Sequence, residues 1–240
     1  MENFINSFQK SFHSTFIEGS RYKLFISGLG VTLNISVFAI LIGILFGIII
    51  ALVRLSRNNK VNNSFFRILL RIAVGFADIY IDVIRGTPAV VQLMIMYYVV
   101  LVRVDSKVII AIIAFAINSG AYIAEIFRAG ILAVDKGQME ASRSLGLNYF
   151  QSMYKIIIPQ AIKNILPALA NEFIVLIKET AIVGYVALQD LTKVGDFIIS
   201  RTADAIFPLL SIAVIYFIII KILTILVSVL ERRLRQSDIR

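Results

Sequence analysis

The 240-residue chain is 59% hydrophobic and 16% charged, whereas a typical soluble domain has about 25% charged residues. It contains no cysteine, which excludes disulfides and thiolate metal sites. Its net charge of +9 comes from Lys and Arg at the ends of apolar runs, so it does not indicate nucleic-acid binding. These properties predict an integral membrane protein. The single histidine, His13, lies in a polar amino-terminal stretch and is expected to be a surface residue.

Uncharged apolar runs recur along the chain, and with their neighbours they approach the length of about 20 residues that a helix needs to cross a bilayer. Residues 2–20 have no apolar core, so we do not expect a signal peptide. No stretch alternates as barrel strands do, which leaves helices. The sequence predicts an all-α membrane protein with about five transmembrane helices in one domain, residues 1–240. The expected segments are 24–53, 64–102, 107–132, 156–186 and 207–230.

Two local patterns refine the first two segments. Gly43 and Gly47 form a small-xxx-small motif that permits close approach of a second helix, although a helix without a dedicated partner also tolerates them. Residues 64–85 are amphipathic and favour an elbow at the membrane interface, which Asp78, Asp82 and Arg85 would orient. Gly86-Thr87-Pro88 then breaks the chain, and Pro88 can open the next helix.

The positive charges predict the orientation of the chain in the membrane. The connections on one side carry 14 Lys and Arg residues, and those on the other side carry 7. The positive-inside rule places the richer side in the cytoplasm. We therefore expect the amino terminus outside and the carboxyl terminus inside.

Residues 135–160 form a polar loop on the predicted cytoplasmic side. The spacing predicts a short helix, a turn at Gly146 and a second helix that begins or bends at Pro159. Glu140 is expected in the first turn, where a carboxylate favours the positive end of the helix dipole. The loop is too polar for lipid and too short for a domain, so it should be a docking element for a partner.

This loop resembles that of the permeases of binding-protein-dependent ABC importers, which read Glu-Ala-Ala, three residues, Gly, about nine residues, and Ile-x-Leu-Pro. Here the chain has Glu140-Ala141-Ser142, Gly146 and Ile156-Ile-Ile-Pro159, with Ser in place of the second Ala and Ile in place of Leu. Four segments are also similar to hallmarks of the polar amino acid branch. They are Arg85–Gln92, Ala121–Gly130, Ile158–Ala161 and Lys178-Glu179-Thr180, the last followed by Ala181 where many relatives have Ser.

The resemblance, which covers residues 24–235, implies the transmembrane architecture of type I ABC importers. It implies a second copy of the permease or a paralogue, a cytoplasmic ABC ATPase dimer, and an extracellular binding protein that delivers the substrate. The residues expected to couple to the ATPase are Glu140, Ala141, Ser142, Gly146 and Pro159. No phosphate-binding loop motif occurs in the chain, so energy must come from another polypeptide or from an ion gradient. We expect no cofactor or metal in this chain, with ATP and Mg bound by the partner.

Ionisable and polar residues inside the spans are candidates for substrate binding, because they are costly in lipid. In the third span Asn118, Tyr122 and Glu125 share one helix face. The full candidate set is Asn118, Ser119, Tyr122, Glu125, Asn171, Glu172, Lys178 and Glu179. A structural reading stays open: Glu125 and Arg128 could form a local pair, and Lys178 with Glu179 could neutralise charge or stabilise a dimer.

These patterns indicate a non-enzymatic transport subunit of a bacterial-type cell membrane that imports a polar L-amino acid by alternating access. Arginine, histidine or glutamine is expected ahead of cystine. Two other classes stay open. A proton-coupled secondary transporter would need no ATPase, and a membrane-embedded enzyme would need a catalytic set that the sequence does not display.

Overall fold

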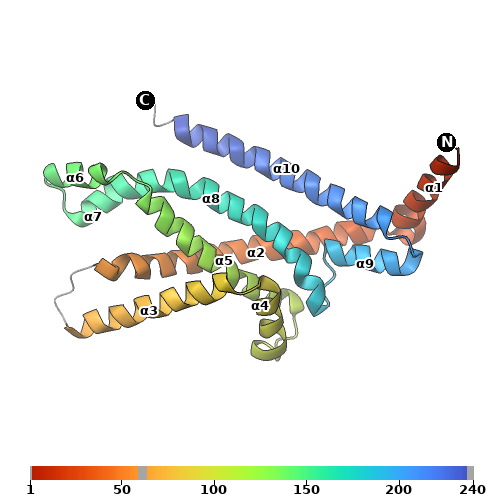
Figure 1. The fold of residues 1–240 in the computed structure, drawn as a ribbon, viewed down its shortest axis with the longest axis horizontal. Coiled ribbons are helices and arrows are strands. Elements are labelled where there is room, and N and C mark those ends of the chain that lie inside the picture. Colours follow the sequence, from red (N-terminus) through yellow and green to blue (C-terminus); the bar gives the residue numbers. More distant parts are fainter. Residues whose placement is uncertain (1, 59–63, 237–240) are drawn as a thin grey trace.

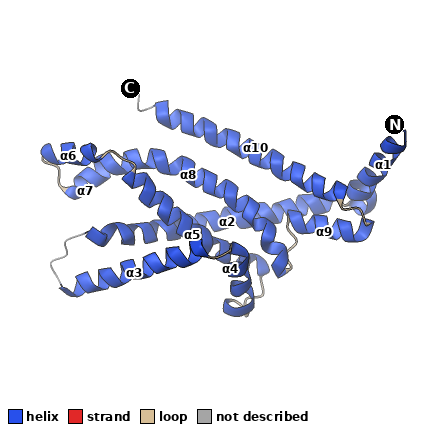
Figure 2. Cartoon of the chain, in the orientation of Figure 1, coloured by secondary structure: helices blue, strands red, loops and turns tan. Residues whose placement is uncertain are grey.

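The computed structural model describes residues 2–58 and 64–236, and Lys60 and Arg240, which entered the charge count, lie outside them. Every regular element of the described residues is a helix, as Figure 2 shows, so the predicted all-α class is confirmed. The principal helices are α1 (Glu2–Phe12), α2 (Tyr22–Leu55), α3 (Ser64–Gly86), α4 (Ala89–Ile95), α5 (Lys107–Leu132), α6 (Lys136–Ser144), α7 (Tyr149–Ser152), α8 (Ile158–Glu179), α9 (Leu191–Thr202) and α10 (Ile206–Gln236).

Within the described residues, three helices are long and apolar enough to cross a membrane: α2, α5 and α10, the last over residues 206–234. They coincide with the first, third and fifth predicted segments. The second and fourth segments are each composed of several pieces. Residues 64–102 form α3, α4 and a π-helical turn at Met96–Val100, and the segment 156–186 includes α8 and a 3₁₀ stretch at Thr180–Val186.

The amphipathic segment predicted as an interfacial elbow forms the helix α3. Figure 1 shows α3 running back along α2, and the two helices are in contact. The Asp78 carboxylate of α3 binds the Arg54 side chain of α2 at 2.8 Å, and the Tyr80 hydroxyl donates to the Ile117 carbonyl of α5. The buried residues of α3 are Val74, Ala77 and Ile81, so a narrow apolar stripe together with Asp78 and Tyr80 faces the other helices. Large apolar residues such as Phe65, Phe76 and Ile79 are exposed.

The long helices α2 and α5 form the most extensive helix pair, and glycines permit it. A Cβ atom on Gly47 would lie 2.6 Å from Ile123 Cγ2, and one on Gly43 would collide with the Ser119 hydroxyl. The small-xxx-small motif of α2 therefore has its partner within the same chain, because only glycine lets the two backbones approach so closely.

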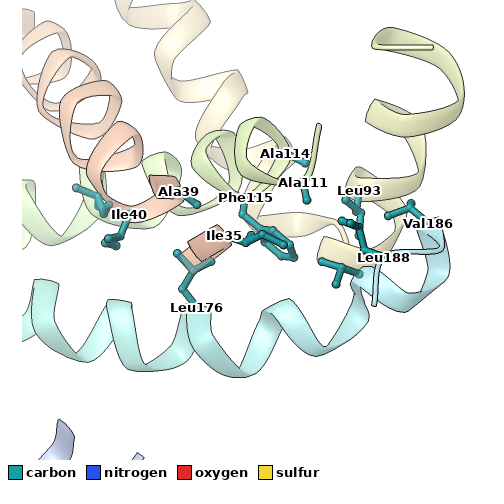
Figure 3. Close-up of a cluster of buried hydrophobic side chains, with 12 residues drawn as sticks. Ile35, Ala39, Ile40, Leu93, Ala111, Ala114, Phe115, Leu176, Val186 and Leu188 are labelled. Atoms are coloured by element: carbon teal, nitrogen blue, oxygen red, sulfur yellow. The ribbon is translucent and has the colours of Figure 1, made fainter. Parts of the chain in front are cut away.

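A buried apolar cluster joins α2, α5 and α8 to the short helix α4. Ile35 of α2, Phe115 of α5 and Leu176 of α8 meet at its centre, and Leu93 attaches α4 (Figure 3). Val186 and Leu188 close it at the end of the 3₁₀ stretch. This core fixes the polar faces of α4, α5 and α8 relative to one another.

The two ends of the bundle differ. The short helices α6 and α7 lie at one end, here called the loop end, and α1 and α9 lie at the other, the α9 end (Figure 1). At the α9 end Asp190 is fully buried and caps α9, accepting from the Thr192 and Lys193 amides at 3.0 Å. Gly28 of α2 packs on the Asp190 backbone, where a Cβ would lie 2.9 Å from the carbonyl oxygen. These contacts attach α9 to α2.

Candidate functional site

The break between α3 and α4 is held by one glutamine. Gln92 Nε2 donates to the carbonyls of Ile84 and Thr87 at 2.8 and 3.1 Å and to the Thr87 hydroxyl at 2.7 Å. Its Oε1 accepts from Asn118 Nδ2 at 2.9 Å. Gln92 thereby satisfies backbone groups that the interruption of the helix leaves free, and it ties the break to α5. Pro88 stands in extended conformation directly before α4, as predicted for a helix start.

The polar residues of α5 point in different directions. Asn118 is buried against Gln92, and Ser119 is buried against Gly43 of α2. Tyr122 is half-buried, and the Arg85 guanidinium from the end of α3 lies 5.5 Å from the centre of its ring. This is a cation–π geometry. The predicted face of Asn118 and Tyr122 therefore turns toward the α3–α4 break.

Arg85 also lies near an acidic residue of α8. The half-buried Glu172 carboxylate lies within electrostatic range of Arg85 and of Glu179, and Glu179 is in turn within range of Lys178. Arg85, Tyr122, Glu172 and Glu179 are here called the charged cluster. Both signs of charge converge there beside the break. The Asn171 and Lys178 side chains are exposed on α8.

Glu125 lies apart from the charged cluster, in an ion-pair network toward the loop end. Its carboxylate accepts from Arg128 Nε at 3.0 Å and from Arg54 Nη1 of α2 at 2.9 Å. Asp78 of α3 binds Arg54 and also Arg57, just beyond α2. Glu125 therefore forms the local pair with Arg128 that the sequence allowed. Arg54 and Asp78 extend this pair to α2 and α3.

Sequence reasoning did not place Arg85 and Gln92 among the site residues. It assigned Arg85 to an interfacial elbow, and Gln92 served only as the last residue of a hallmark segment. A signal was present, because both polar residues flank the Gly-Thr-Pro break within eight positions. A helix break in an apolar region leaves backbone groups to satisfy, and a nearby amide is suited to that task.

The polar loop has the helix–turn–helix form that was predicted. Gly146 follows α6 with φ +84°, and its amide donates to the Arg143 carbonyl while the Leu147 amide donates to the Ser142 carbonyl. This is a Schellman motif, in which glycine takes the left-handed position at low cost. Pro159 stands in the first turn of α8, as expected.

Glu140 is not in the first turn of α6, contrary to the prediction. The helix begins at Lys136, and the Asp135 side chain caps it by accepting from the Gly137 amide at 2.6 Å. Asp135 therefore supplies the carboxylate at the positive end of the dipole, one turn before Glu140. Ala141 and Glu140 are exposed, whereas Ser142 is buried and donates to the Met139 carbonyl.

Several large apolar side chains of this loop are exposed on the surface. Leu145, Phe150 and Tyr154 are 81%, 79% and 76% exposed. They sit among charged and polar residues of α6 and α7, at the loop end and outside the long apolar helices.

Residues 43–236 match the family described as binding-protein-dependent transport system inner membrane component. The chain belongs to this family. Over 212 residues the permease is 39% identical to the putative glutamine transport system permease protein GlnP of Rickettsia bellii, covering 87% of this chain and 92% of the relative. It is 38% identical over 217 residues to the arginine transport system permease protein ArtQ of Bacillus subtilis, covering 89% and 93%.

Solved structures agree with this assignment. The permease superposes on a chain from a crystal structure of an amino acid ABC transporter with histidines, with a TM-score of 0.79 and 44% identity, covering 91% of this chain and 98% of that one. An inward-facing MetNI methionine ABC transporter gives a TM-score of 0.71 at 18% identity, which supports the fold alone. The type I ABC importer fold and the multi-pass membrane character are thus confirmed.

Proposed function

We propose that this permease is the transmembrane subunit of an ATP-driven importer that moves a polar L-amino acid by alternating access. The observation that carries the substrate class is the charged cluster, where Arg85 lies over Tyr122 and within electrostatic range of Glu172, which is itself within range of Glu179. A free amino acid bears a carboxylate and an ammonium group, so a site for it needs both signs of charge. The named substrates of similar proteins, glutamine and arginine, favour the same class.

In this proposal the substrate carboxylate faces Arg85 or Lys178, and its ammonium group faces Glu172 or Glu179. Asn118 contributes an amide at the same break, and Asn171 extends the polar face of α8. Ser119 and Glu125 contribute indirectly: the first holds α5 against α2, and the second belongs to the ion-pair network. The favoured substrates are arginine, histidine and glutamine, because two carboxylates accept a cationic or amide side chain.

The docking loop would couple this site to ATP hydrolysis. Its exposed Leu145, Phe150 and Tyr154 offer apolar contacts to a cytoplasmic ATPase, which would bind ATP and Mg. The Gly146 turn and Pro159 set the angle between α6 and α8. Glu140 and Ala141 are exposed for contact, and buried Ser142 holds the loop in shape. A second permease copy and an extracellular binding protein complete the assembly.

Transport by the reconstituted assembly tests the substrate class. We expect ATP-dependent uptake of a polar amino acid, and we expect Glu172→Gln to raise the half-saturating concentration about tenfold, as for the loss of one charge-assisted contact. Glu18→Gln is the matched control, because that carboxylate is exposed before α2. Absence of uptake for every polar amino acid would refute the proposal, as would uptake driven by a pH gradient without the ATPase.

Two loop variants test the coupling role separately. Gly146→Ala forces a side chain into a left-handed conformation, at a cost of about 1 kcal/mol, and distorts the turn. Glu140→Ala removes an exposed carboxylate and leaves the fold unchanged. Both should lower co-purification with the ATPase while membrane insertion stays normal, and Gly30→Ala in α2 serves as the control. Normal ATPase association in both variants would contradict the docking role.

A further inference from the structure

The amino-terminal helix α1 is amphipathic and lies outside the transport machinery described above. Ile5, Phe8 and Phe12 recur at i, i+3 and i+7 on one face, and they are about half exposed. The remaining positions are mostly polar, including Asn6, Gln9 and Lys10. A short helix with this pattern is typical of segments that lie in a membrane interface.

Phenylalanine contacts hold α1 against the start of α10. The rings of Phe8 and Phe207 meet edge to face with centroids 5.2 Å apart, and the Phe12 ring lies 6.3 Å from the same partner. Phe16, in the turn after α1, contacts Phe25 of α2 at 5.0 Å. These contacts give α1 a defined packing position at the α9 end of the bundle.

Between α1 and α10 lies a groove of about 1020 Å³. Phe8 and Phe16 line it from one side, and Phe207, Leu210 and Val214 line it from the other. Two of its polar side chains are already engaged: Asp204 accepts from the Ile206 amide at 3.1 Å, and Ser211 donates to the Phe207 carbonyl at 2.8 Å. The lining therefore favours a hydrocarbon over a polar solute.

The groove is continuous with the apolar surface of α10. Leu210 and Val214 line the groove and are 60% and 54% exposed, and the same helix continues with exposed Phe217 and Ile218. Only 6% of the most apolar window of α10 is buried within the chain. A surface this apolar on a span-length helix faces lipid tails, so the groove opens toward them.

We propose that the groove between α1 and α10 binds an acyl chain of a bilayer lipid, with α1 lying in the membrane interface at the α9 end. The lipid chain covers the apolar faces of Phe8, Phe16 and Leu210. The binding site is separate from the charged cluster, and it does not depend on which amino acid the permease carries.

The chain contains no tryptophan, so a single introduced tryptophan reports on its own surroundings. The full-length permease carrying Phe8→Trp is placed in bilayers of phosphatidylcholine with or without bromine on the acyl chains. Phe217→Trp, on the exposed face of α10, is the lipid-contact control, and Phe150→Trp, in the docking loop, is the water-exposed control. We expect Phe8→Trp to lose about half or more of its fluorescence in brominated lipid, because an acyl chain contacts the ring.

A groove-filling variant distinguishes a bound chain from the bulk bilayer. Ser211→Phe places a ring in the groove, and adding it to Phe8→Trp should reduce the quenching toward the level of Phe150→Trp. Quenching that is unchanged by Ser211→Phe would overturn the groove as the binding site. If brominated lipid quenches Phe8→Trp no more than Phe150→Trp, α1 does not contact lipid and the proposal is wrong.

A dye attached to the groove wall tests lipid contact independently, in case Phe8→Trp does not fold. The chain has no cysteine, so Ser11→Cys on the wall of the groove can carry a single fluorescent dye. Nitroxide on the lipid acyl chains should quench that dye. If the dye is not quenched and Ser11→Cys instead cross-links two permease copies, the groove binds protein and the proposal is wrong.

Discussion

Asp190 combines complete burial with a structural task at the start of α9. Burial raises the pKa of its carboxyl group above the ordinary value, although the Lys193 and Thr192 amides that it accepts from act in the opposite direction. The Thr192 hydroxyl also lies 3.3 Å from the Tyr216 hydroxyl of α10. Asp190 thus connects the start of α9 to α2, and Thr192 connects it to α10.

The raised pKa of Asp190 predicts how stability depends on pH. Between the ordinary pKa of aspartate and the raised value, the folded chain binds a proton that the unfolded chain has lost. Stability contributed by this group therefore falls as pH rises through that interval. Asp190→Asn keeps a capping oxygen but cannot titrate. Thermal unfolding in detergent across this pH range should show a flatter pH dependence for Asp190→Asn than for the native chain, and equal slopes would contradict the assignment.

Two glycines of α2 allow a matched comparison of packing. A Cβ on Gly47 would lie 2.6 Å from Ile123, whereas one on Gly30 meets nothing within 4 Å. Gly47→Ala should therefore destabilise the permease by about 1–3 kcal/mol through overpacking. Gly30→Ala should be neutral or gain up to about 1 kcal/mol of helix propensity. Unfolding temperatures of the two variants measure the difference, and equal values would show that α2 and α5 can separate without cost.

At the scale of helices, the ion-pair network joins three elements toward the loop end. Arg54 binds Asp78 of α3 and Glu125 of α5, and its side chain is only 20% exposed. Arg57 binds the same Asp78 but is 54% exposed. Arg54 therefore balances two carboxylates from different helices, while Arg57 adds a surface contact.

Replacing each arginine by glutamine separates these contributions. Arg54→Gln leaves two neighbouring carboxylates without their shared cation, and we expect a loss of about 1–3 kcal/mol, less than for a fully buried pair because solvent reaches the site. Arg57→Gln should cost less than about 1 kcal/mol, as for other exposed pairs. Denaturation of the two variants in detergent gives both values. Similar losses would indicate that burial does not distinguish the two arginines.

At the scale of the whole molecule, the two ends of the bundle have different chemistry. The loop end presents exposed Leu145, Phe150 and Tyr154, which suit a protein partner. The opposite end holds α9, capped by buried Asp190, and α1 with its apolar face. The proposed orientation, with the loop end in the cytoplasm, rests on the excess of Lys and Arg on that side.

Single cysteines can test this orientation, because the native chain has none. Ser200→Cys lies on α9 and Ser144→Cys lies on α6, and both positions are exposed. In intact cells a membrane-impermeant maleimide should label Ser200→Cys at once and Ser144→Cys only after the membrane is permeabilised. The reverse pattern would invert the proposed topology.

The predictions that succeeded depend on short stretches of sequence. Apolar runs identified α2, α5 and α10, because hydrophobicity over one helix length decides whether a segment suits a membrane. The break at Gly86-Thr87-Pro88 and the Gly146 turn were also correct, since glycine and proline act on the local backbone. The apolar spacing of Ile5, Phe8 and Phe12 carried the same kind of signal for α1 and was overlooked.

The sequence by itself therefore determined the helical class, the apolar spans and the helix–turn–helix form of the loop at 135–160. Tertiary structure alone decided the direction of α3, the place of Arg85 beside Tyr122, and the network around Glu125. Arg54 and Glu125 are 71 positions apart, and nothing local indicates that their helices meet. The physical reason is that a charged residue takes its partner from whichever helix packs against it, and that packing follows from the close α2–α5 contact and the shared apolar core.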